Sequence, residues 1–88
     1  MHRRDREEIL EKLKPHFGTP ELDEELAKLP EKQQEYALSL YGLDGQAPAT
    51  AKEVASIYGV SESVVNQGAE TALRKLAHPS VQKRLEGK

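Results

Sequence analysis

Residues 48–76 read PATAKEVASIYGVSESVVNQGAETALRKL and have the pattern of two helices joined by a short turn. Thr50 and Glu53 have the T-x-x-E spacing of a capping box, which begins the first helix. Gly59 ends that helix, because glycine adopts the left-handed conformation without steric cost. Ser61 is a good N-cap for the second helix. Two helices that meet at a tight glycine-containing turn are typical of the helix-turn-helix, whose second helix reads double-stranded DNA.

The small and apolar residues around the turn support this interpretation. We expect a first helix over about 51–58, with Val54, Ala55 and Ile57 at its apolar or small positions, and a recognition helix over about 61–77. Ala55 lies four residues before the turn glycine, where two closely crossing helices leave no room for a large side chain. An ordinary helical hairpin inside a bundle is the alternative.

The rest of the chain is predicted to be helical as well, which gives an all-α fold of about five short helices in a single domain, 1–88. Residues 1–29 are rich in Glu, Lys and Leu and are expected to form N-terminal bracing helices for the helix-turn-helix. Apolar stripes and proline breaks place the other helices at about 4–14, from Thr19-Pro20 onward, at about 30–41 and at about 79–85. Clustered acidic residues at a helix start are expected to complement the helix dipole; they are Glu21, Asp23, Glu24 and Glu25.

Composition excludes several classes of protein. The chain has 88 residues and no cysteine, which leaves a thin core and neither disulfides nor thiolate zinc sites. No apolar run approaches the roughly 20 residues of a membrane span, and no secretory signal is visible, so we expect a cytoplasmic protein without membrane contact. The three histidines lack metal-ligand spacing, and there is no phosphate loop, nucleophile motif or catalytic carboxylate pair. We therefore expect no enzymatic activity, no metal and no cofactor.

The net charge of −2 is unusual for a DNA-binding domain, because phosphate contacts supply much of the affinity. The charges are unevenly distributed, however. Residues 1–47 hold 11 acidic and 7 basic residues, whereas residues 48–88 hold 4 acidic and 6 basic residues. The positive excess lies in the half that carries the helix-turn-helix, and its small size predicts salt-sensitive binding of modest affinity.

From Leu29 to Leu85 the chain resembles region four of the primary bacterial sigma factors. The matching landmarks are LPEKQQEYALSLYGLDG, the T-x-x-E-V-A helix, YGVSES and ALRKLAHPS. The resemblance implies an all-helical fold whose recognition helix enters the major groove of promoter DNA. It also implies docking onto the flap of RNA polymerase.

The chain departs from the family on the recognition helix. The family typically shows a run such as R-E-R-V-R-Q-I-E, whereas residues 62–69 here read ESVVNQGA. Glu62, Val64 and Asn66 stand where the family has arginines. We therefore expect a scaffold whose recognition helix was rewritten for a different DNA sequence, as in an engineered or retargeted binder. The alternative is a relative that lost DNA reading and kept docking on RNA polymerase or an anti-sigma partner.

The exposed positions of a recognition helix are its N-terminal turn and the residues one and two turns later. The candidates for base reading are Ser61, Glu62, Ser63, Asn66, Gln67 and Glu70. Asn66 and Gln67 are the strongest, because their amides can pair with N6 and N7 of adenine, and they predict a target rich in A·T pairs. Glu62 can accept a hydrogen bond from cytosine N4 or complement the helix N-terminus.

Phosphate contacts are predicted at Thr50, Lys52, Arg74 and Lys75. Val64 can touch a thymine methyl group or be partly buried. Gly68 replaces a bulky apolar residue of the family. One interpretation is that the missing side chain lets the helix lie closer to DNA or to its brace. The interpretation that we favour is that a larger neighbour such as Tyr58 fills the space.

Three function classes follow from the sequence. Sequence-specific binding of double-stranded DNA by a monomer is the leading prediction. A module that docks on RNA polymerase or an anti-sigma partner is the second, and a purely structural helical domain is the third.

Overall fold

The computed structural model describes residues 2–87, which form six α-helices and one short 3-10 helix, with no strand among them. The elements are α1 (Arg3–Leu13), η1 (Lys14–His16), α2 (Pro20–Ala27), α3 (Glu31–Tyr41), α4 (Ala51–Tyr58), α5 (Glu62–Leu76) and α6 (Pro79–Glu86). The predicted all-α class is confirmed. Six α-helices are found where about five were predicted, and each lies at one of the residue ranges placed from the sequence, including the short helices that begin at Pro20 and Pro79.

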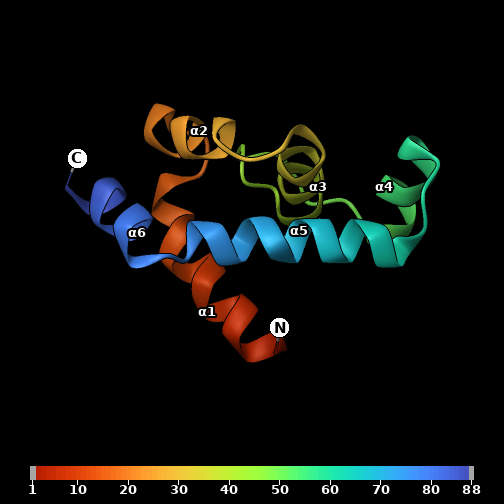
Figure 1. The fold of residues 1–88 in the computed structure, drawn as a ribbon, viewed down its shortest axis with the longest axis horizontal. Coiled ribbons are helices and arrows are strands. Elements are labelled where there is room, and N and C mark those ends of the chain that lie inside the picture. Colours follow the sequence, from red (N-terminus) through yellow and green to blue (C-terminus); the bar gives the residue numbers. More distant parts are fainter. Residues whose placement is uncertain (1, 88) are drawn as a thin grey trace.

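The longest helix, α5, runs along the long axis of the molecule (Figure 1). In this view α2, α3 and α4 lie above α5, and the first turns of α1 lie below it. The most extensive packing is between α3 and α5, followed by α4 against α5. The recognition helix of the sequence analysis is therefore the central element on which the other helices pack.

One continuous core holds these helices together. The bracing segment contributes to the same core as the helix-turn-helix, and the turn between α3 and α4 contributes Leu43. The fully buried large side chains are Leu13, Leu22, Leu26, Leu43, Val54, Val65, Leu73 and Leu76. Burial of such side chains contributes about 1.5–3 kcal/mol each, so the N-terminal helices and the motif stabilise each other.

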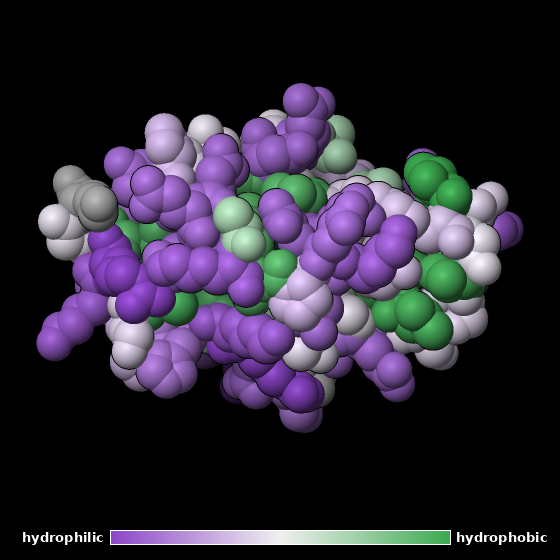
Figure 2. Space-filling model, turned by 45° about the horizontal axis from the view of Figure 1, so that its top comes forward, coloured by the Kyte–Doolittle hydropathy of each residue, from purple (hydrophilic) through white to green (hydrophobic). Residues whose placement is uncertain are grey.

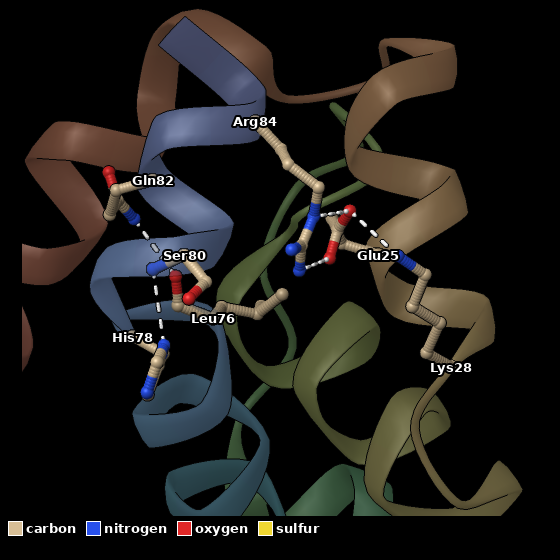
Figure 3. A network of polar contacts seen from close by, with 7 residues as sticks. All are labelled: Glu25, Lys28, Leu76, His78, Ser80, Gln82 and Arg84. Atoms are coloured by element: carbon tan, nitrogen blue, oxygen red, sulfur yellow. Dashed lines mark hydrogen bonds and ion pairs between the residues drawn. The ribbon is translucent and has the colours of Figure 1, made fainter. Parts of the chain in front are cut away.

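A buried ion pair joins α2 to α6 (Figure 3). Glu25 is only 6% exposed. Arg84 donates to its carboxylate twice, from Nε to Oε2 at 2.9 Å and from Nη2 to Oε1 at 2.8 Å. Lys28 Nζ donates to Oε2 at 3.1 Å. The Arg84 hydrogen bonds are the largest cause that lowers the pKa of Glu25 to about 2. Glu25 lies beyond the first turn of α2, so this pairing replaces the dipole role predicted for it.

Side chains also fix the turn between α5 and α6. His78 is the N-cap of α6, and its Nδ1 accepts a hydrogen bond from the Ser80 amide at 3.1 Å. Gln82 Nε2 donates to the carbonyl of Leu76, the last residue of α5, at 2.9 Å (Figure 3). These bonds satisfy polar groups that the helix ends leave without partners inside the helix.

Candidate nucleic-acid interface

The first motif helix, α4, begins with the predicted capping box. Thr50 Oγ1 accepts a hydrogen bond from the Glu53 amide at 3.1 Å, and Glu53 Oε1 accepts one from the Thr50 amide at 3.4 Å. Two amides of the first turn are thus satisfied reciprocally. The Thr50 hydroxyl also lies 3.0 Å from Glu53 Oε1. The hydrogen-bonding capacity of the Thr50 hydroxyl is therefore largely used within the cap.

The turn between α4 and α5 is fixed by backbone geometry. Gly59 has a φ of 67°, in the left-handed region that favours glycine. A Cβ atom there would meet nothing within 4 Å, so the backbone conformation, and not crowding, selects glycine. The amides of Gly59 and Val60 both bond to the carbonyl of Ala55. Ser61 then caps α5, because its Oγ accepts from the Val64 amide at 3.2 Å.

The buried faces of α4 and α5 carry small or β-branched side chains. Ala55 is buried at 6% exposure, and Ala69 and Ala72 are fully buried on α5. Val54 and Val65 are also fully buried. α4 packs against α5, and the side of α5 that faces away from its buried residues forms an open surface.

The predicted base-reading residues lie mainly on this open surface. Exposed side chains are those of Ser61, Glu62, Ser63, Asn66 and Gln67. Ser63 and Gln67 are four residues apart on α5 and lie one above the other. The structure therefore gathers five of the six candidates over the first two turns of α5.

The sixth candidate, Glu70, is half-buried. It acts electrostatically on the hydroxyl of Tyr41 at the end of α3. Burial is the largest cause that raises the pKa of Tyr41, Arg6 of α1 opposes it, and Glu70 adds to it. Glu70 therefore lies at the border of the open surface, beside α1 and α3, where it is the least accessible of the six candidates.

The predicted phosphate-contacting residues differ in how free their side chains are. Lys52 on α4 and Arg74 on α5 are exposed. Lys75 is also exposed, but its Nζ donates to Gln33 Oε1 on α3 at 3.1 Å. Lys75 thus points toward α3, whereas Lys52 lies in the first turn of α4, close to the helix N-terminus that can itself bind a phosphate.

Gly68 allows α3 to approach α5 closely. A Cβ atom at Gly68 would lie 2.7 Å from Cδ2 and 3.3 Å from Cε2 of Tyr36. The ring of Tyr58 meets the ring of Tyr36 edge to face, with centroids 5.2 Å apart, and Lys32 Nζ lies 4.8 Å from the Tyr58 centroid. A larger neighbour does fill the space at Gly68, as we favoured, but that neighbour is Tyr36. Tyr58 packs on the ring of Tyr36 instead. The tyrosine lies 32 positions earlier in the chain, too far for a local pattern to identify it.

Two large hydrophobic side chains at the motif are exposed, of which the sequence had left exposure open for Val64 and had not predicted it for Ile57. Ile57 is 76% exposed and Val64 is 43% exposed. Figure 2 shows hydrophobic side chains gathered at the end of the molecule formed by α4 and the start of α5. Ile57 was grouped with the buried side of α4, because an apolar residue next to Val54 fits a helical stripe.

No helix among residues 2–87 has the length and hydrophobicity needed to cross a membrane. Within the same residues, no three His, Asp or Glu side chains are grouped so that they could hold a metal ion.

Comparison with known proteins agrees with this geometry. The sequence model of the family "Sigma-70, region 4" matches residues 26–78. The chain is also 36% identical over 66 residues to the RNA polymerase sigma factor SigA of Bacillus sp, an alignment that covers 75% of this chain. The chain spans only 18% of the length of that relative. No solved structure matches the chain closely enough to show a relationship.

Proposed function

This chain belongs to the sigma-70 region 4 family, and we propose that it is a monomeric, sequence-specific binder of double-stranded DNA. In the proposed complex the first two turns of α5 enter the major groove. The observation that carries the proposal is the position of Ser63, Asn66 and Gln67. They lie exposed on a capped helix start whose opposite face is fully packed. B-DNA offers a major groove wide enough for one such helix, and base edges there can be told apart by hydrogen bonding.

The side chains on the open surface favour A·T pairs. Each amide of Asn66 and Gln67 can donate to N7 and accept from N6 of adenine. Ser63 can bond base edges or phosphate. Glu62 stands in the first turn of α5, where it can accept from cytosine N4 or complement the positive helix end.

Phosphate contacts on either side of the groove hold the helix in register in this proposal. Lys52 at the start of α4 and Arg74 near the end of α5 are the exposed cations suited to that role. Lys75 and Thr50 contribute less, because Gln33 and Glu53 already engage them.

The target in this proposal differs from the usual promoter element of the family. Glu62, Val64 and Asn66 replace arginines of the family pattern, whereas the capping box, turn glycine and helix packing are kept. A retained scaffold with changed reading residues is the pattern of a retargeted or engineered binder.

A second candidate function is docking on RNA polymerase or an anti-sigma partner. The observation that favours it is the exposed hydrophobic surface around Ile57, at 76% exposure, together with the net charge of −2. Large exposed apolar side chains are common in protein interfaces, and a negative chain gains little from the phosphate backbone.

A binding screen separates the two functions. The purified chain is selected against a randomised double-stranded DNA library at moderate salt, beside the double variant Asn66→Ala, Gln67→Ala. Gln46→Ala serves as a matched control, because Gln46 is an exposed glutamine outside α5.

DNA binding predicts an enriched motif that the control variant keeps and the double variant loses. Each lost base contact is expected to cost about 1–3 kcal/mol on the preferred site only. A folded protein that enriches no motif would reject DNA reading and favour docking on the polymerase or an anti-sigma partner.

A further inference from the structure

Val64 is a hydrophobic side chain placed among the proposed base readers. Its exposed fraction is 43%. Among residues 2–87, the large hydrophobic residues that are exposed are Val64 on α5 and Ile57 on α4. It lies in the first turn of α5, where its amide is bonded to Ser61 Oγ. Packing within the chain therefore leaves much of this side chain in water, which is unfavourable for an apolar group.

The helical position of Val64 aligns it with Gln67. The two residues are three positions apart, so they are surface neighbours about 5–6 Å from each other at Cβ. Successive bases along one strand of DNA rise by about 3.4 Å. Val64 and Gln67 can thus face base pairs that are next to each other or one step apart. Gly68, which follows Gln67, packs on Tyr36, and this places Val64 on the α3 side of the open surface.

The chemistry of the groove identifies the group that Val64 would contact. The C5-methyl group of thymine is the apolar group that the base pairs present in the major groove. A valine in a helix has one strongly preferred rotamer, so contact with a methyl group costs little side-chain entropy. An arginine at this position, as in the family pattern, favours guanine instead.

We propose that Val64 reads a thymine through its methyl group, beside an adenine read by Gln67. The inference rests on the proposed function and decides between the two alternatives left open for Val64, contact with a thymine methyl group and partial burial. The target then contains neighbouring A·T pairs, with a thymine whose methyl group adds to the affinity. Val64 is the residue that determines specificity at that pair.

Two small chemical changes in the DNA test the contacts of Val64 and Gln67 separately. The probes are duplexes that carry the motif enriched in the library screen. In one series each thymine is replaced in turn by deoxyuridine, which removes only the methyl group. In the other series each adenine is replaced by 7-deazaadenine, which removes only the N7 acceptor. Dissociation constants are measured for the parent chain, Val64→Ala and Gln67→Ala.

The expected result is a crossed pattern. At one thymine, deoxyuridine weakens binding of the parent chain by roughly fourfold, the effect of one buried methyl group. Val64→Ala loses this effect but keeps the sensitivity to 7-deazaadenine. Gln67→Ala shows the reverse. Thermal unfolding followed by circular dichroism shows that both variants remain folded, as expected for exposed positions.

Two outcomes would overturn the inference, and they are distinguishable. If a motif is enriched but Val64→Ala keeps the full deoxyuridine effect, or no thymine shows one, Val64 does not read a methyl group while DNA reading stands. Its exposed side chain then belongs with Ile57 in a protein-docking surface. If no motif is enriched at all, the proposed function fails and the inference fails with it.

Discussion

Replacement of Gly68 by alanine tests the contact that sets the distance between α3 and α5. Glycine inside a helix is destabilising by about 1 kcal/mol relative to alanine, so Gly68→Ala at an open position would stabilise the chain. Here the new Cβ atom would lie 2.7 Å from Tyr36 Cδ2. Optimal contact between carbon atoms is about 3.5–4.0 Å, so the ring or the helix must move by about 1 Å.

The tyrosine ring has little room to move. Tyr36 is 5% exposed, and Tyr58 packs against it edge to face at 5.2 Å. Overpacking of this kind costs about 1–3 kcal/mol. After subtraction of the gain of about 1 kcal/mol in helix propensity, Gly68→Ala should lower the free energy of unfolding by about 1 kcal/mol, with a range of about 0–2.

Urea unfolding followed by circular dichroism measures this effect. The same substitution made in a chain without the Tyr36 ring should change the free energy of unfolding in the opposite direction. In the Tyr36→Leu chain the rigid ring is absent, so Gly68→Ala should raise the free energy of unfolding by up to about 1 kcal/mol. The coupling between the two positions would then be about 2 kcal/mol, within the range for residues in direct contact. Equal stabilisation by Gly68→Ala in both backgrounds would refute the argument that Tyr36 selects glycine.

Three further predictions concern the ion pair, the N-cap and the phosphate contacts. The pKa of Glu25 falls from 4.5 to about 2 on folding, so its contribution to stability is present above about pH 4.5 and is lost as the pH falls toward 2. Because solvent screens the half-exposed Arg84, we expect acid to lower the free energy of unfolding of the parent chain by about 1–2 kcal/mol, as measured by urea unfolding at each pH. Glu25→Gln should make the free energy of unfolding depend less on pH over this range. Ser61→Ala should lower the free energy of unfolding by about 1 kcal/mol, since the first turn of α5 loses its cap; an unchanged urea midpoint would show that water replaces it. Lys52→Ala should reduce the slope of log affinity against log salt by about 1 on every duplex, whereas Lys12→Ala, an exposed lysine of α1, should leave the slope unchanged.

The helix-turn-helix could be predicted from the sequence because short-range interactions specify it. The capping box of Thr50 and Glu53, the left-handed Gly59 and the Ser61 cap each depend on residues within four positions of one another. The exposed placement of Asn66 and Gln67 follows from the helical period once the buried side is known. The all-α class followed from the same period along the rest of the chain.

Side-chain partners that are distant in the sequence could not be predicted in this way. The Lys75 hydrogen bond to Gln33 spans 42 positions, and it turns a predicted phosphate contact toward α3. Glu70 fits the exposed period of a recognition helix, yet the packing of α1 and α3 leaves it half-buried.

By itself, then, the sequence determined where the motif helices begin and end and which residue types the recognition helix carries. Only the tertiary structure decided that Tyr36 occupies the space left at Gly68, that Glu25 pairs with Arg84 across 59 positions, and that Ile57 remains exposed. The physical reason is the range of the interactions. Caps and turns are closed by neighbouring backbone groups, whereas burial and long-range pairing depend on how complete helices pack against one another.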